Sequence, residues 1–414
     1  MKQMFHDSVW QVRDFRRLAL GRSVAAAGTG LVTVVQLLRA HGGGPDVIML
    51  LLLAEAIPPI LFAGLIGQIA DRRDSRSVLA IGIATQTAAC LLLATNPNLA
   101  LTCATMACLS AGAALSGPIW MVLVPMVVGE RRVGAAIGGQ QALRAALAPL
   151  GAGAGGLLFS GVGTGVAMLV STACYLQLGV VALQLGVRRR GEPGVASTPS
   201  SSVRSRLQRS LVPDLSLLRR DRFVWRLTLS LVPLIVVVQG VNVLEVLLAR
   251  NDIGVSAAQF GASEVAAGVG AVLGAGVAGR VVGAQGRGWS ILGGFGACSA
   301  AIGALGATRT VGWYFALLVI VGFGAGVANA CFGALFIGRT PAAERGRVSA
   351  SINGLMLTAA TSSIALGGVC GVLIGVRASF VAAGLAGLAV LAVAAAFLPR
   401  TPTTAPTPSL TPAH

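Results

Sequence analysis

The feature that most constrains this chain is a series of long apolar stretches, each near the length of a bilayer-crossing helix. Such a helix needs roughly 20 predominantly apolar residues. The stretches lie at about 18–38, 47–70, 77–95, 99–127, 134–158 and 165–187, and then at about 223–248, 258–280, 289–307, 311–338, 348–374 and 379–398. Because backbone polar groups find no water in hydrocarbon, each stretch should be helical. The sequence therefore predicts an all-α membrane protein with twelve transmembrane helices.

The composition argues against a soluble protein. Hydrophobic residues make up 55% of the chain and charged residues only 11%, whereas a soluble domain carries about 25% charged residues. The formal net charge of +17 could indicate a nucleic-acid partner. However, the arginines fall between the apolar stretches and do not follow one basic face. We therefore expect a lipid bilayer around the protein and no nucleic acid bound to it.

The basic residues also predict how the helices are oriented. If the N-terminus is cytoplasmic, nearly all of the 31 Lys and Arg residues fall on the cytoplasmic side. The exceptions are Arg144, which lies within a stretch, and Arg39, Arg250, Arg309 and Arg377, which fall outside. This imbalance follows the positive-inside rule for an even number of crossings. Lys2 is the single lysine, and the many Arg, Ala and Gly residues are typical of a GC-rich bacterium. We expect a bacterial cytoplasmic membrane, with both termini cytoplasmic.

A polar interval divides the apolar stretches into two sets of six. We expect an N-terminal six-helix bundle at 1–187 and a C-terminal six-helix bundle at 223–399. The cytoplasmic linker 188–222 contains a segment that could form an interfacial helix, and the Pro/Thr-rich tail 400–414 is expected to be disordered. Two similar halves joined by a loop are typical of internally repeated transporters.

Three short motifs resemble those of the major facilitator superfamily. Residues 67–76, GQIADRRDSR, resemble the loop signature G-x-x-A-D-R-x-G-R-R between its second and third helices. Gly117-Pro118 with Pro125 resembles an element at the end of the fourth helix, and residues 340–348, TPAAERGRV, resemble T-P-x-x-x-R-G-R-V between the tenth and eleventh. Asp74 replaces a Gly of the general signature. This replacement is familiar in the drug:proton antiporter branch, which includes enterobactin exporters and transmembrane secretion effectors.

This resemblance implies the major facilitator fold and secondary active transport by alternating access. In that branch the activity is proton-coupled efflux of a small hydrophobic or amphiphilic compound, such as a drug, siderophore or secondary metabolite, with antibiotic resistance as one consequence. Proton-coupled uptake by the same fold stays open, because the motifs do not encode direction. A membrane-embedded enzyme would need a cluster of Asp, His or Cys, and the chain has no DxxxD or HxxxH motif. We expect a transporter that is not an enzyme and works as a monomer.

Charged residues inside the apolar stretches are the first functional candidates. A charge there costs at least about 2.5–3.5 kcal/mol, so those that are kept usually serve function. Glu55, Glu245 and Glu264 are candidates for proton coupling, because desolvation favours the neutral form of a carboxylate. The alternatives are a structural ion pair, for example with Arg144, and solvation for Glu245 near the end of its stretch. Arg144 could instead attract an acidic substrate.

Polar and aromatic residues within the stretches extend the candidate sites. The predicted substrate cavity comprises Arg144, Gln36, Gln239, Asn242 and Trp120, although helix–helix hydrogen bonding or interfacial anchoring would also account for the last four. The motif loops predict a conformational latch between the two halves, which could equally be topology charges: Gly67, Asp71, Arg72, Arg76, Arg345 and Arg347. The seven cysteines form no CxxC pair, and the chain has three histidines. We therefore expect no metal and no cofactor.

Overall fold

The computed structural model describes residues 9–62, 69, 73–129, 132–186, 232–281, 283–339 and 345–397. These residues are helical apart from short connections, and they contain no strand. The first half comprises α2 (Arg13–Ala40), α3 (Pro45–Leu61), α5 (Ser75–Ala94), α6 (Leu99–Val128), α7 (Val133–Gly161) and α8 (Gly163–Gln184), with short 3-10 turns at Val9–Gln11 and His41–Gly43. The second comprises a helix over Val232–Ile253 that includes α12 (Asn242–Leu247) and the π-helical η4 (Leu248–Ile253), then α13 (Ala257–Ala278), α14 (Ala284–Ala307), α15 (Val311–Arg339), α16 (Arg345–Ile374) and α17 (Val376–Phe397).

The predicted twelve transmembrane helices are confirmed. Eleven helices in the described ranges are long and apolar enough to cross a bilayer. The twelfth is α3, which has 17 described residues and whose apolar stretch continues to about residue 70 in the sequence. The linker 188–222 and the tail 400–414 lie outside the described residues.

The seventh helix ends later than the sequence suggested. Its apolar stretch stops near residue 248, where Arg250, Asn251 and Asp252 begin a polar run. The helix nevertheless continues to Ile253 through the π-helical η4. Two of the polar side chains have partners there: Arg250 donates to the Val255 carbonyl at 2.8 Å, and Asp252 pairs with Arg377 at 3.6 Å. A polar run therefore extends the helix and does not end it.

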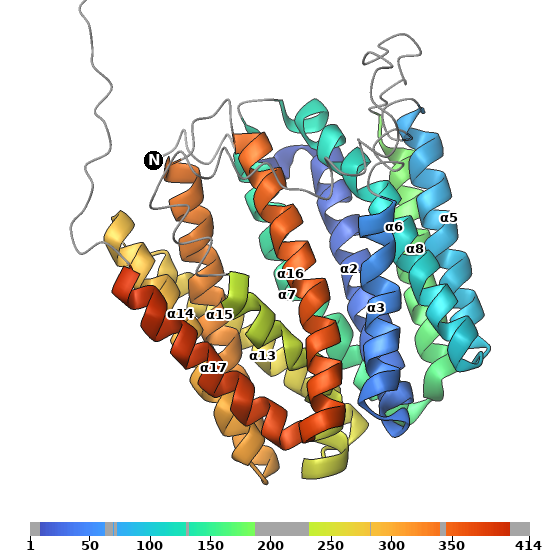
Figure 1. Ribbon diagram of the computed structural model, residues 1–414. Helices are drawn as coiled ribbons and strands as arrows, with labels where there is room; N and C mark the ends of the chain where they lie inside the picture. Colours follow the sequence, from blue (N-terminus) through green and yellow to red (C-terminus); the bar gives the residue numbers. More distant parts are fainter. Residues whose placement is uncertain are drawn as a thin grey trace, which may run out of the picture.

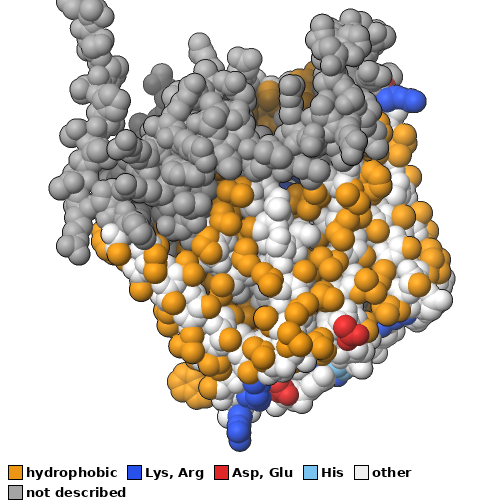
Figure 2. Space-filling model, viewed as in Figure 1, with side chains coloured by type: hydrophobic (Ala, Val, Ile, Leu, Met, Phe, Trp, Pro, Cys, Tyr) orange, Lys and Arg blue, Asp and Glu red, His pale blue; other side chains and the backbone are white. Residues whose placement is uncertain are grey.

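Apolar side chains cover the outside of the molecule between its two ends. In Figure 2 the visible described surface is largely hydrophobic, and the charged side chains gather near its edges. Leu183, Leu373 and Trp313 are at least 65% exposed. Since a soluble protein rarely exposes so large a contiguous apolar area, this surface is suited to lipid.

The helices form two six-helix bundles, one from each half of the chain (Figure 1). Within the first, α2 packs against α7 and α8, and α5 packs against α6 and α8. Within the second, α15 packs against α13 and α14, and α14 packs against α17. The bundles meet where α7 packs on α13 and where α3 packs on α16 and α12. This is the architecture that the sequence predicted.

Candidate functional site

The two ends of the molecule are named here by the helices that reach them. The terminal side is the side at which α2 begins and α17 ends, and the opposite side is the one at which α2 ends and α17 begins. Since the helices alternate in direction, α7 runs from the terminal to the opposite side and α13 runs back.

The bundles are in tight contact in their opposite-side halves. A Cβ atom placed on Gly261 of α13 would lie 2.8 Å from the carbonyl oxygen of Gly153 and 2.9 Å from Cα of Gly156, both on α7. The second interface is equally close, because a Cβ on Gly368 of α16 would lie 2.6 Å from Cβ of Met49 on α3. Glycine at 261 therefore lets the backbones of α7 and α13 approach, and glycine at 368 leaves room for the Met49 side chain.

The same helix faces lose contact toward the terminal side. On α7, Gly138 precedes Pro149 by eleven residues, and on α13, Gly276 follows Val265 by eleven residues. Eleven residues are about three helical turns, so each glycine lies on the same helix face as its partner in this comparison, but closer to the terminal side. Pro149 and Val265 both touch the partner bundle, at Gly268 and Gly153. A Cβ on Gly138 or on Gly276, however, would meet nothing within 4 Å. The bundles therefore separate toward the terminal side, where open space lies beside Gly138 and Gly276, and this space between α7 and α13 is called the cleft.

The second bundle contains a cavity of about 640 Å³ bounded by the helix over 232–253 and by α14, α15, α16 and α17. Its wall is mainly apolar, with Phe295 and Phe332 among the lining residues. Its polar groups are few: Gln239 and Asn242, joined by a 2.9 Å hydrogen bond, together with Glu245 and Asn329. Ligand pockets typically combine apolar walls with a few polar groups that set orientation. Two predicted cavity residues, Gln239 and Asn242, thus lie in one pocket with a predicted proton carrier.

A hydrogen-bonded chain extends from this cavity into the bundle. The Tyr314 hydroxyl donates to Glu245 Oε1 at 3.2 Å and lies 3.2 Å from Ser263 Oγ, which in turn donates to the Phe260 carbonyl. Glu264 is the next residue along α13, close enough to Glu245 for the two carboxylates to repel each other. The structure therefore brings Glu245 and Glu264 together around a fully buried tyrosine.

Glu55 belongs to the other bundle. It lies on α3, where Pro58 and Pro59 stand inside the helix. Across the bundle, Thr29 and Tyr175 are joined by a 2.9 Å hydrogen bond, and Glu55 lies near enough to Tyr175 to act on it electrostatically. Among the described residues Glu55 forms no ion pair, so the predicted alternative of a pair with Arg144 is not observed.

The remaining cavity candidates occupy the first bundle. Trp120 is buried at 2% exposure, and the guanidinium of Arg22 lies 5.9 Å from the centre of its ring. Arg144 on α7 is exposed and lies close enough to Arg22 for their charges to interact. Gln36 is buried against α8, where its amide lies 3.6 Å from Met168 Sδ.

The predicted latch falls largely outside the described part of the chain. Gly67, Asp71 and Arg72 are not among the described residues, nor are the side chains of Arg345 and Arg347 at the start of α16. Arg76 is described, and its guanidinium donates to the Leu185 carbonyl at 3.0 Å, which ties α5 to the end of α8.

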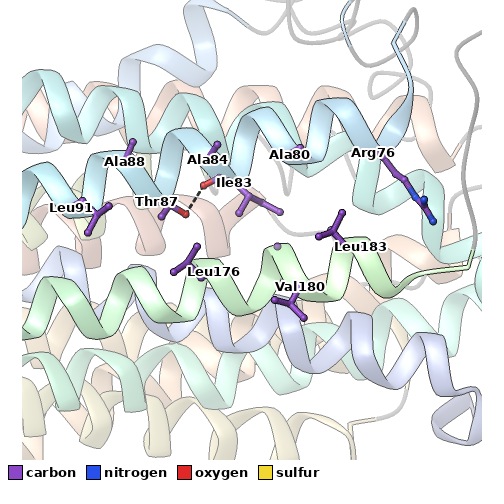
Figure 3. Close-up of a pocket in the computed structure, with 12 residues that line it drawn as sticks. Arg76, Ala80, Ile83, Ala84, Thr87, Ala88, Leu91, Leu176, Val180 and Leu183 are labelled. Atoms are coloured by element: carbon purple, nitrogen blue, oxygen red, sulfur yellow. Dashed lines mark hydrogen bonds between the residues drawn. The ribbon is translucent and has the colours of Figure 1, made fainter.

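Arg76 also marks one end of a lateral groove of about 470 Å³ between α5 and α8 (Figure 3). Ile83, Leu176 and Leu183 line this groove, and Thr87 bonds back to the Ile83 carbonyl at 2.8 Å. Both helices pack within the first bundle, so the groove lies apart from the cavity in the second.

Sequence reasoning missed Tyr314, Ser263 and Arg22. Tyr314 and Ser263 are common residue types within apolar stretches, and no motif marks either one. Arg22 stands near the start of its helix, where an arginine is usually a topology charge. Two tyrosines occur in the whole chain, and their rarity within apolar stretches is a signal that could have identified them, because both form interhelical hydrogen bonds.

Metal ligation has no support in the described residues. No group of three or more His, Cys, Asp or Glu is placed there to hold a metal ion. The seven cysteines are all free, and burial of Cys90, Cys298 and Cys331 is consistent with packing as small apolar residues.

Twelve membrane-crossing helices in two bundles, with a cleft between them and a cavity in one, define a multi-pass transporter and not an enzyme. Comparison with family models identifies the family of transporters to which the chain belongs. The model of the Major Facilitator Superfamily matches residues 18–354 and 235–413, and the chain belongs to this family. The resemblance expected from the sequence motifs is therefore confirmed at the level of the superfamily.

Solved structures of transporters share the fold. The human organic anion transporter TETRAN superposes with a TM-score of 0.68 at 16% identity, covering 92% of this chain and 99% of its own. A bacterial homologue of the iron transporter ferroportin, in an inward-facing state, superposes with a TM-score of 0.68 at 16% identity. The match covers 94% of this chain and 99% of the homologue. A POT family transporter in complex with 5-aminolevulinic acid superposes with a TM-score of 0.70 at 13% identity. The match covers 95% of this chain and 98% of that transporter. No curated protein matches the sequence.

Proposed function

We propose that this protein is a proton-coupled exporter of small hydrophobic or amphiphilic compounds. The observation that carries the proposal is the cavity of about 640 Å³ with Glu245 in its wall. An apolar cavity of this size suits a drug-sized ligand. A carboxylate in such a wall can hold either a proton or a polar group of the substrate, which is the requirement for exchanging one for the other.

The arrangement around Glu245 supports a role in proton binding. Glu245 bonds to Tyr314, and Tyr314 lies beside Ser263, the residue that precedes Glu264, so two carboxyl groups gather near one tyrosine and would repel each other if both were ionised. Tyr314 keeps the Glu245 carboxylate in place while a proton comes and goes. Glu55 stays a proposed second proton carrier, because it too is a carboxyl group inside a helix of the membrane-spanning region.

The orientation of the protein follows from the basic residues. They concentrate on the terminal side in the sequence, so we assign that side to the cytoplasm and the membrane to the bacterial inner membrane. The cleft then opens inward, and the contacts of α7 with α13 and of α3 with α16 close the external gate. Export requires that these contacts separate, which exposes the cavity to the outside and allows protons to replace the substrate.

The proposal is tested in inside-out membrane vesicles. We expect an imposed pH gradient to drive a fluorescent amphiphilic dye into the vesicles, which corresponds to export from the cell. Glu245→Gln and Glu264→Gln should abolish pH-driven movement while leaving the folded protein in the membrane. Asp46→Asn is the matched control, because Asp46 is an exposed carboxylate in the first turn of α3.

Two outcomes would count against this function. Full pH-driven transport by the Glu245→Gln, Glu264→Gln and Glu55→Gln variants would remove all the proposed proton carriers. Accumulation in right-side-out vesicles under an inward proton gradient, with none in inside-out vesicles, would show uptake in place of export.

A further inference from the structure

Two arginines of the first bundle lie at a similar depth on α2 and α7, and neither has an acidic partner among the described residues. Arg22 is about nine residues into α2, and Arg144 about eleven residues into α7, so both are well inside their helices. Among the described residues neither guanidinium forms an ion pair or donates a hydrogen bond. Because charges inside a membrane protein are costly and usually paired, an anion supplied by a ligand would stabilise two like charges that have no acidic partner among the described residues.

Arg144 lies on the face of α7 that is turned toward α2. Arg144 lies one turn on the terminal side of Ala148, and the carbonyl of Ala148 would be 2.6 Å from a Cβ on Gly30 of α2. Arg144 therefore projects from the face of α7 that packs on α2, yet its side chain is exposed. An exposed side chain on a face turned toward a neighbouring helix is accessible to a ligand that enters between the bundles.

A third unpartnered donor lies beside them. Gln140 precedes Arg144 by four residues, which places the two side chains on neighbouring positions of one helix face. Its side chain is 3% exposed, and its amide nitrogen has no hydrogen-bond acceptor among the described residues. A buried unsatisfied donor costs about 1–3 kcal/mol, so an acceptor supplied by a ligand would stabilise the site.

Arg22 is held in place by Trp120. The guanidinium carbon of Arg22 lies 5.9 Å from the centre of the indole ring, within the range of a cation–π contact. Trp120 is itself 2% exposed, so its ring is fixed by packing. A cation–π contact leaves guanidinium N–H groups available, and these groups bind carboxylates and sulfonates in a two-pronged fashion.

We propose that Arg22, Arg144 and Gln140 bind the acidic group of the substrate, and that the substrate is therefore an amphiphilic organic anion such as an aromatic carboxylate. This inference rests on the proposed transport function and narrows its substrate class. Arg22 and Arg144 neutralise the acidic group, and Gln140 contributes a directional hydrogen bond. The apolar remainder of the molecule occupies the cleft.

The test compares two probes that share one ring system. 2-Naphthoate carries a carboxylate, and 2-naphthamide is its neutral counterpart of nearly the same shape. Binding to the full-length purified protein is measured by isothermal titration calorimetry. We expect 2-naphthoate to bind roughly tenfold or more tightly than the amide, because hydrogen bonds to charged groups are about twice as strong as neutral ones. Arg144→Gln and Arg22→Gln should each remove most of that preference.

Two further variants separate charge recognition from loss of folding. Arg144→Lys retains the positive charge and should preserve part of the preference for 2-naphthoate, even if Arg144→Gln fails to fold. Arg309→Gln removes an exposed arginine on the opposite side and should leave both affinities unchanged. Equal binding of the two probes to the wild-type protein would overturn the proposal, as would a preference that survives in the Arg22→Gln, Arg144→Gln double variant.

Transport assays distinguish failure of this site from failure of the proposed function. If other compounds are exported by the pH gradient while 2-naphthoate and 2-naphthamide bind equally, the anion site is wrong and the exporter stands. If 2-naphthoate binds through the arginines but no pH gradient moves it or any other probe, the anion site stands and proton-coupled export is wrong.

Discussion

Replacement of Gly261 by valine should shift the protein away from the conformation described here. In this state a Cβ on Gly261 would lie 2.8 Å from the Gly153 carbonyl oxygen, 2.9 Å from Cα of Gly156 and 3.0 Å from its nitrogen. All three are backbone atoms, so no side chain can rotate to make room. Valine adds two methyl groups beyond that Cβ, and α7 and α13 must separate at this contact.

The size of the shift follows from the cost of overpacking. Extra methyl groups in a well-packed interface cost about 1–3 kcal/mol. In the state with the opposite side open, α7 and α13 are apart at this point and the valine costs little. The cost therefore acts on the equilibrium between the two states, and 1–3 kcal/mol corresponds to a shift of roughly 5- to 150-fold.

Hydrogen exchange read by mass spectrometry reports this equilibrium without labels. In Gly261→Val, amides of α7 and α13 near residues 150–161 and 257–265 should exchange faster, because the opposite side opens more often. Amides near 133–140 and 275–280 should exchange more slowly, since the terminal side closes. Substrate turnover should fall, because the cycle must pass through the disfavoured state.

Gly293→Val is the matched control for this experiment. Gly293 is an exposed position on α14 where a Cβ would meet nothing within 4 Å, so the same change of residue type should leave exchange and transport unaltered. An exchange pattern in Gly261→Val that matches the wild type, with normal transport, would show that the α7–α13 contact is not a gate. Faster exchange throughout both bundles would indicate general destabilisation instead.

Three further substitutions test other parts of the structure. Tyr314→Phe should slow pH-driven transport roughly tenfold, because one hydrogen bond to a charged Glu245 is lost; an unchanged rate in vesicles would remove Tyr314 from the proton site. Gly276→Val should favour the present state, since the added side chain fills open space at the terminal side of α13 and hinders closure there; slower exchange at the terminal side would contradict this. Arg377→Gln should lower the melting temperature in detergent, because Arg377 joins α17 to Asp252 and to the Gly306 and Thr308 carbonyls. The partly exposed ion pair contributes about 1 kcal/mol at most to that loss, and an unchanged melting temperature would show that these bonds are replaced by water.

The sequence alone determined the class of fold and the number of crossings. Apolar length is a local property, because each transmembrane helix must satisfy its own backbone in lipid whatever its neighbours are. Charge placement relative to those stretches is equally local, so it predicted both the division into two halves and a cytoplasmic side. The loop and glycine motifs added the superfamily, which the family comparison confirmed.

The end of the seventh helix shows where local reasoning stops. The polar run Arg250–Asp252 suggests a helix terminus, but the helix continues to Ile253, where Arg250 bonds to the Val255 carbonyl and Asp252 pairs with Arg377 of α17. The same limit applies to the candidate latch, whose residues lie largely outside the described chain and which stays a prediction.

Only the tertiary structure decided which polar residues meet. Glu245 and Tyr314 are 69 residues apart in the chain, and Ser263 and Tyr314 are 51 apart, yet they form one hydrogen-bonded cluster. Arg22 and Arg144 lie on different helices, α2 and α7, at a similar distance from the terminal side. Helix periodicity fixes which face a residue occupies, but the packing of one helix against another selects its partner. That packing depends on close approaches such as the one between Gly153 and Gly261, which no local pattern specifies.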